Sequence, residues 1–325
     1  MSTSSHTDPA PVLVGVAEGG EHRALRWAAA EAVRRRLPLQ VLHAYSTETS
    51  YPWGYEYPIP AGVLHDVEES ARTNAMSLLE DAAESVRAKH PDLTVTTTLS
   101  RASAAASLVT GSEGASIVVV GHRAHKHPWA ASLGSVSLAV AAHAACPVVV
   151  VPEFDIETTG EHEDESARTR RAAGQVVVGV EDSVECLDAV GFAFAHASAH
   201  GLAVTAVHGW WVDPAVMALA EGAEWAEIGE EEKVVVDAIL APWVARYPDV
   251  KVSRVVAKDV PSHALVEAGN GAQLLVVGSR GRGGFKGLLL GSVSRQVLQH
   301  ARCPVAVVRA GQIPGADDVD VSYPT

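Results

Sequence analysis

The feature of this sequence that most restricts its fold is an internal repeat. Ala115–Arg123 (ASIVVVGHR) matches Ala272–Arg280 (AQLLVVGSR), and Cys146–Val151 (CPVVVV) matches Cys303–Val308 (CPVAVV) at the same spacing. Self-similarity of this length indicates a duplicated structural unit. The chain has 325 residues, which is enough for two domains of ordinary size. The repeat therefore predicts two similar domains in tandem.

Each half of the chain alternates short apolar runs with segments of helical periodicity. PVLVGVA and QVVVGVE open the two halves as strand-like runs that stop at polar or glycine residues. Segments 23–36, 63–89 and 231–246 carry apolar residues three and four positions apart. Near-continuous apolar strands separated by helices indicate a parallel sheet covered on both faces. The predicted fold is α/β, with two tandem doubly wound, Rossmann-like domains.

The repeat also predicts the domain boundaries. We expect domain one at residues 10–152 and domain two at residues 174–310. The stretch 153–173 is polar, charged and poor in apolar residues, which is typical of an exposed linker. The tail at residues 311–325 is predicted to be disordered.

Composition excludes several classes of function. The chain has 39 acidic and 25 basic residues and a net charge of -14, which disfavours nucleic acid as a partner. The apolar runs are too short to span a bilayer, and we find no secretory signal. Three sparse cysteines form neither a disulfide framework nor a CxxC metal pattern. We therefore expect a cytoplasmic protein that does not contact membranes.

A glycine-rich loop ends the fourth predicted strand of the second half. It reads GSRGRGGFKGLLLGS (Gly278–Ser292), with the spacing Gly-x2-Gly-x9-Gly-Ser. Ligands of open α/β sheets lie outside the carboxyl ends of the strands, where glycine lets the backbone approach closely. A helix starting at Ser292 would offer unpaired N–H groups to an anion. Hydroxyls at Ser292 and Ser294 and cations at Arg280, Arg282 and Lys286 suit a polyphosphate. The alternative is that these glycines only form turns.

This segment resembles the signature of ATP-binding universal stress proteins, as do the preceding LLVVGS and the following SVSRQVLQHARCPVAVV. The loop is neither a Walker A motif nor GxGxxG. The resemblance extends over nearly all of both halves. It implies a five-stranded parallel sheet in each domain, of the adenine nucleotide alpha hydrolase-like type, with ATP at the carboxyl ends of strands one and four. By this resemblance Gly278, Gly281, Gly291 and Ser292 would hold the phosphates and ribose.

The first strand of domain two departs slightly from the family pattern. The family has an Asp in a sequence such as GVDGS, whereas this chain reads GVEDS, so Glu181 takes that place. Gly209 matches the position that flanks the adenine in the family. The full set of nucleotide-binding residues that we predict in domain two is Val180, Glu181, Gly209, Val277, Gly278, Arg280, Gly281, Gly291, Ser292, Val293 and Ser294.

Domain one departs further. Its loop, GHRAHKHPWAASLGS (Gly121–Ser135), keeps the spacing, but Ala124 replaces the second glycine and Ala17 replaces the acidic residue. If that loop position needs a positive φ, alanine costs on the order of 1 kcal/mol or more. The candidate residues that remain are Gly121, Gly134, Ser135, Val136 and Ser137. Whether domain one binds nucleotide stays open.

Several histidines and aromatic residues allow more than one interpretation. His122, His125 and His127 fit no known metal pattern, so we interpret them as a solvated loop and predict no metal site. His43 and His208 end equivalent strands, which predicts a shared buried hydrogen bond rather than catalysis. The aromatic segments 51–60 and 209–225 suit either lids and interfaces or local packing.

Three functions remain compatible with the sequence. The first is a stress-response regulatory module that binds ATP, with or without Mg2+, and is read by unknown protein partners. The others are a slow ATPase or phosphotransferase and a ligand-free scaffold. The loop lacks a Walker lysine, and Glu181 is the obvious nearby carboxylate, which favours binding over turnover. In the family the last strand often pairs with that of another domain. Here 148–151 could pair with 305–308 within one chain, giving a pseudo-symmetric monomer, or such chains could form a homodimer.

Overall fold

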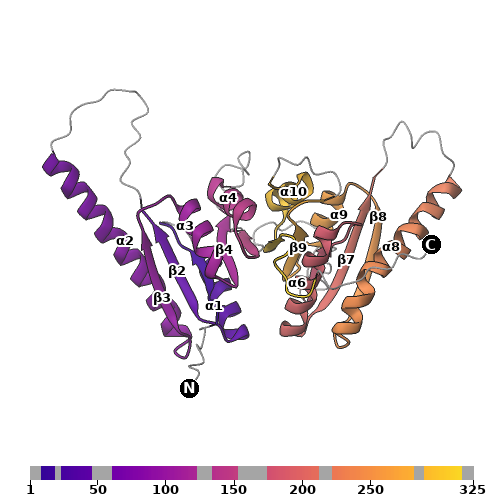
Figure 1. Ribbon diagram of the computed structural model, residues 1–325, viewed down its shortest axis with the longest axis horizontal. Helices are drawn as coiled ribbons and strands as arrows, with labels where there is room; N and C mark the ends of the chain where they lie inside the picture. Colours follow the sequence, from indigo (N-terminus) through magenta and orange to yellow (C-terminus); the bar gives the residue numbers. More distant parts are fainter. Residues whose placement is uncertain are drawn as a thin grey trace, which may run out of the picture.

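The structure is a computed structural model that describes residues 9–18, 23–45, 61–122, 134–152, 174–211, 222–281 and 289–316. Two α/β halves meet at the centre, and the long helices α2 (Ala61–Lys89) and α8 (Gly222–Arg246) lie at the outer ends (Figure 1). None of the helices in these ranges is both long and apolar enough to cross a membrane.

The two halves repeat the same order of elements. The first half contains β1 (Val12–Gly15), α1 (Arg23–Arg35), β2 (Leu39–Ala44), α2, β3 (Val95–Ser100), α3 (Ala104–Gly111), β4 (Ile117–His122), α4 (Ser135–His143) and β5 (Val148–Pro152). The second half contains β6 (Gln175–Gly179), α6 (Val184–His200), β7 (Ala203–Trp210), α8, β8 (Val252–Lys258), α9 (Pro261–Ala268), β9 (Leu274–Gly278), α10 (Ser292–His300) and β10 (Val305–Val308). The predicted doubly wound α/β fold is confirmed.

The described strands form one ten-stranded sheet with the order β3-β2-β1-β4-β5-β10-β9-β6-β7-β8. Neighbours within each half are parallel, and β5 and β10 pair antiparallel, with Val305 opposite Val150 and Val307 opposite Val148. This contact is the internal pairing of last strands, which the sequence left open as one possibility. In each half, the first and fourth strands are neighbours, as Val178 of β6 opposite Val276 of β9 shows. The carboxyl ends of these two strands form the switch point at which α/β sheets bind ligands.

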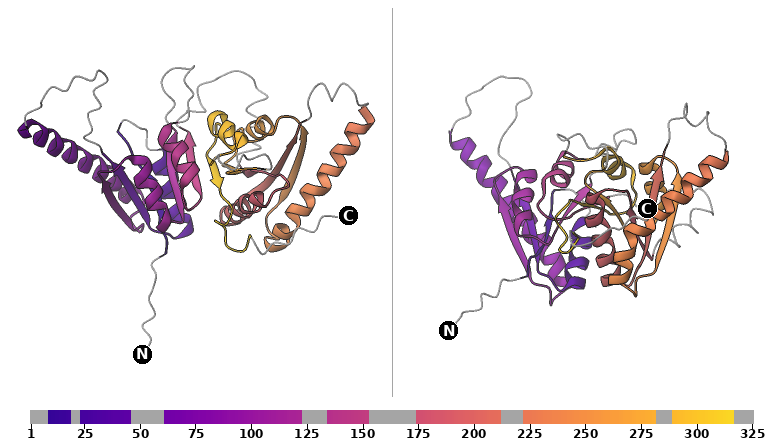
Figure 2. Two further views of the ribbon diagram at one scale, coloured as in Figure 1. Left: turned by 45° about the horizontal axis from the view of Figure 1, so that its top comes forward. Right: turned by 45° about the vertical axis from the view of Figure 1, so that its right-hand side comes forward.

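The apolar core crosses the junction between the halves on both faces of the sheet. On one face, α1, α2, α6 and α8 cover a cluster that includes Val149 of β5 and Ala306 of β10. On the other face, α3, α4, α9 and α10 cover a cluster that includes Val150 and Val305. Helices α1 and α6 approach each other at the centre of the molecule (Figure 2). The halves therefore share their core rather than touching only along a strand edge.

The start of the C-terminal tail packs against domain two. The amides of Gly311 and Ile313 donate to the two carboxylate oxygens of Asp188, at 3.2 and 2.7 Å. Asp188 is buried in α6, and Ala316 is buried as well. The prediction of disorder from residue 311 is therefore wrong for residues 311–316, because a buried carboxylate in the domain accepts their backbone hydrogen bonds. The linker at 153–173 and the aromatic segment at 51–60 lie outside the described residues.

Candidate functional site

The structure brings Glu181 and Gly281 together at the carboxyl ends of β6 and β9. A Cβ built on Gly281 would lie 2.5 Å from both carboxylate oxygens of Glu181. The hydroxyl of Ser183 donates to Oε1 of Glu181 at 3.0 Å. The carboxylate thus extends from the end of the first strand of domain two to the backbone of the glycine-rich loop.

The reason for glycine at position 281 differs from the sequence-based expectation. In the described residues, positive φ occurs at Gly201, Gly271, Gly311 and Gly315 among the glycines, and Gly281 is not one of them. A side chain at Gly281 would instead displace the Glu181 carboxylate from its present position. In domain one, Ala17 and Ala124 replace both members of this pair. The glutamate and the glycine are therefore both present in domain two and both absent from domain one.

Hydrogen bonds connect the start of α10 to the end of β9. Gly291 is the N-cap residue, and its amide donates to the carbonyl of Ser279 at 2.7 Å. The hydroxyl of Ser294 donates to the carbonyl of Gly278 at 2.6 Å. Ser137 makes the same bond to Gly121 in domain one, at 2.9 Å. These buried serines therefore fix the helix start relative to the strand, whereas Ser292 is exposed in the first turn.

The remaining predicted residues contribute in different ways. The side chains of Val180 and Val277 are buried in the core, which leaves only their backbone atoms toward the loop. Arg280 is exposed beside the site, and Val293 is half-buried. In domain one Gly134 is the N-cap of α4, followed by exposed Ser135 and half-buried Val136. Of the loop residues considered above, Ala124, His125, His127, Arg282 and Lys286 lie outside the described residues.

The two strand-end histidines perform the same structural task. Nδ1 of His43 donates to the carbonyl of Val16 at 2.9 Å, and Nδ1 of His208 donates to the carbonyl of Val180 at 2.7 Å. Both rings are buried. This confirms the predicted shared hydrogen bond, which fixes the segment that leads into Glu181.

His122 is not part of a solvated loop, contrary to the sequence interpretation. It is the last residue of β4 and is 3% exposed. Burial lowers the pKa of its imidazole. Strand β4 includes Gly121 and His122, the first two residues of the predicted loop, and this places the ring inside the domain. His127, like His125, lies outside the described residues.

Sequence reasoning missed two residues that support Glu181. Besides Ser183, the thiol of Cys186 lies 3.4 Å from the Glu181 amide and 3.6 Å from the Gly179 carbonyl. Burial raises the pKa of this thiol to about 12, so it acts as a buried neutral group. Both residues follow the GVED sequence by at most four positions. This closeness along the chain is the sequence feature that could have indicated their contact with Glu181.

Gly209 has a packing role that explains its small size. A Cβ at this position would lie 2.6 Å from Cα of Pro261 and 3.2 Å from the carbonyl oxygen of Asp259. Both contacts are to backbone, so no side-chain rotation relieves them. The start of α9 therefore requires glycine here even without an adenine ring.

The Gly209→Ala substitution is expected to lower the free energy of unfolding by about 1–3 kcal/mol, the usual range for overpacking. Urea denaturation of the nucleotide-free chain, followed by circular dichroism, measures this change. If Gly209 only made room for adenine, stability would be unchanged and nucleotide affinity alone would fall.

Comparison with known proteins agrees with this architecture. The sequence model of the universal stress protein family matches residues 10–152 and 173–309. Universal stress protein Rv2623 of Mycobacterium tuberculosis is 36% identical over 310 residues, which cover 94% of this chain and 98% of that protein. A universal stress protein of Mycolicibacterium smegmatis is 38% identical over 300 residues, covering 92% and 96%.

A solved structure shows the same fold over most of the chain. It is that of a universal stress protein from Archaeoglobus fulgidus, with a TM-score of 0.63 and 17% sequence identity, covering 93% of this chain and 96% of that one. The family model matches both halves, and the curated relatives match nearly the full length. The chain therefore belongs to the universal stress protein family, with two domains of that family in tandem.

Proposed function

We propose that domain two binds ATP, with or without Mg2+, and that the bound nucleotide makes this protein a regulatory module in the stress response. The observation that carries the proposal is the Glu181 carboxylate held against the backbone of Gly281. The pair lies at the carboxyl ends of neighbouring strands, where open α/β sheets bind ligands.

The surroundings of this pair suit the parts of a nucleotide. The first turn of α10 offers backbone N–H groups and the positive end of the helix dipole to phosphates. Exposed Arg280 adds a cation in a chain of net charge -14. Glu181 can accept hydrogen bonds from ribose hydroxyls or coordinate a Mg2+ ion that the phosphates bring.

The same residues favour binding over rapid turnover. Phosphoryl transfer needs a positioned nucleophile and neutralised charge. The glycine-rich loop has no Walker lysine, and one Glu181 oxygen already accepts a hydrogen bond from Ser183. We therefore propose that unidentified protein partners read the occupied and empty states. The proposed location is the cytoplasm, since a reducing compartment suits three buried free cysteines.

Isothermal titration of the full, nucleotide-stripped chain with ATP and Mg2+ tests this proposal. We expect saturable binding that Glu181→Gln weakens by about tenfold or more, because a hydrogen bond to a charged group is worth ~1.5–3 kcal/mol. Glu18→Gln is the matched control, since it removes an exposed carboxylate from the equivalent loop of domain one. No heat with millimolar ATP would overturn the proposal and favour a ligand-free scaffold. Steady phosphate release by the full chain would favour the ATPase alternative.

A further inference from the structure

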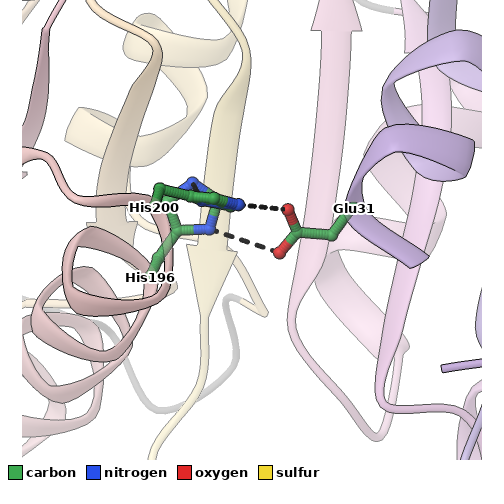
Figure 3. A group of neighbouring side chains, drawn as sticks. All are labelled: Glu31, His196 and His200. Atoms are coloured by element: carbon green, nitrogen blue, oxygen red, sulfur yellow. Dashed lines mark hydrogen bonds and ion pairs between the residues drawn. The ribbon is translucent and has the colours of Figure 1, made fainter. Parts of the chain in front are cut away.

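Three side chains with metal-binding groups meet in the interior between the two domains. Glu31 of α1 faces His196 and His200 of α6 (Figure 3). Nε2 of His200 lies 3.0 Å from Oε2 of Glu31, and Nδ1 of His196 lies 3.3 Å from Oε1. The side chains of all three are at most 8% exposed. The cluster is far along the chain from the nucleotide loop and plays no part in the proposed nucleotide site.

The arrangement fits the ligands and spacing of a transition-metal site. His196 and His200 are four residues apart and therefore lie on one face of α6. Two imidazoles and a carboxylate form a ligand set that Zn2+ takes in proteins, with bonds of about 2.0–2.2 Å. Tetrahedral bonds of that length place ligand atoms about 3.3 Å apart, close to the two nitrogen–oxygen separations. One ligand atom from each residue lies within 4.8 Å of the others.

We propose that Glu31, His196 and His200 bind a divalent transition-metal ion of the zinc class, which ties α1 of domain one to α6 of domain two. The three protein ligands leave a fourth coordination position for water. Because the ligands come from different domains, the ion stabilises the arrangement of the two halves of the sheet.

Arg35 competes with the ion for the same carboxylate. Its Nε donates to Oε1 of Glu31, and its Nη2 lies 3.5 Å from Nδ1 of His196. Nδ1 of His200 lies 3.0 Å from Nε2 of His196, so the four side chains can close a ring of hydrogen bonds without a metal. The Arg35 side chain is 24% exposed and can turn toward solvent when an ion takes its place. When both rings bind the ion, Nε2 of His196 and Nδ1 of His200 each carry a proton. These two N–H groups face each other, so the distance between the rings must then increase.

Titration of the full, nucleotide-free and chelator-treated chain with Zn2+ and Co2+ tests the proposal. We expect one ion per chain to bind at this cluster, and Co2+ to give the visible absorption of a four-coordinate site. The double variant His196→Asn/His200→Asn should bind Zn2+ at least about 100-fold more weakly. Removing a residue that only hydrogen-bonds to a metal ligand costs up to about 100-fold in affinity, and this variant removes two ligands. Zn2+ should raise the unfolding temperature of the unchanged chain but not of this variant.

Further variants separate the ligands from their neighbours. Glu31→Gln keeps the shape of the side chain and should weaken binding, and His200→Asn alone serves if that variant fails to fold. Arg35→Gln keeps every ligand and should bind the ion at least as tightly. His125→Asn/His127→Asn removes the other histidine cluster and should leave binding unchanged. Equal Zn2+ affinity in the unchanged chain and in His196→Asn/His200→Asn would overturn the proposal and leave the metal-free hydrogen-bonded ring.

Discussion

Replacing Ala306 with aspartate is expected to lower the free energy of unfolding by about 3–5 kcal/mol, the cost of leaving an uncompensated charge in a protein interior. Ala306 is fully buried in β10. It lies opposite Val149 of β5 on one side and Val276 of β9 on the other, at the centre of the ten-stranded sheet. Because the core is continuous there, the carboxylate has no route to solvent that leaves both halves intact.

Urea denaturation of the full chain measures this effect, and Val255→Asp is the matched control. Val255 lies on β8, the strand at the end of the sheet, and is 43% exposed. The same new charge there should change the free energy of unfolding by no more than about 0.5 kcal/mol. If both variants unfolded at the same urea concentration, the junction would not be part of the folded core.

Replacing Gly281 with alanine is expected to weaken ATP binding by about ten- to hundredfold. The new methyl group would lie 2.5 Å from both oxygens of Glu181, so the carboxylate or the loop must move. The carboxylate is the far end of a flexible side chain and can turn away, but it then loses its proposed hydrogen bond to the nucleotide. A hydrogen bond to a charged group is worth about 1.5–3 kcal/mol, and each 1.4 kcal/mol is a factor of ten in affinity. Isothermal titration with ATP gives the change directly.

A double-mutant cycle identifies the cause of that loss. In the Glu181→Ala background the obstructing carboxylate is absent, so Gly281→Ala should have little further effect on affinity. The double variant also reproduces the pair found in domain one, Ala17 and Ala124. Equal losses in both backgrounds would show that contact with Glu181 is not the reason for glycine at this position.

The fold was predictable because its determinants are local and duplicated. The apolar runs VVVV and VAVV at the ends of the two repeats read as equivalent strands, and the structure pairs them as β5 and β10. Alternation of such strands with helical segments was sufficient to predict two doubly wound halves. The sequence also pointed to His43 and His208 as equivalent hydrogen-bonding residues, because both end the second strand of their repeat.

Contacts between distant residues could not be predicted in the same way. The sequence shows a glycine at 281, but the approach of the Glu181 carboxylate to that position depends on the pairing of β6 and β9. His196 and His200 read as one face of a helix, and nothing in the repeat places Glu31 against them. Asp188 likewise reads as an ordinary helical carboxylate, although it accepts hydrogen bonds from Gly311 and Ile313.

The antiparallel pairing of β5 with β10 has a consequence for the protein at low abundance. When single-domain subunits associate through such a strand, the fraction that is paired falls as the protein is diluted. Here both partners belong to one polypeptide, so their association is a unimolecular equilibrium that does not depend on the protein concentration. A cell that makes only a few copies of this chain would still have each copy with its two halves joined.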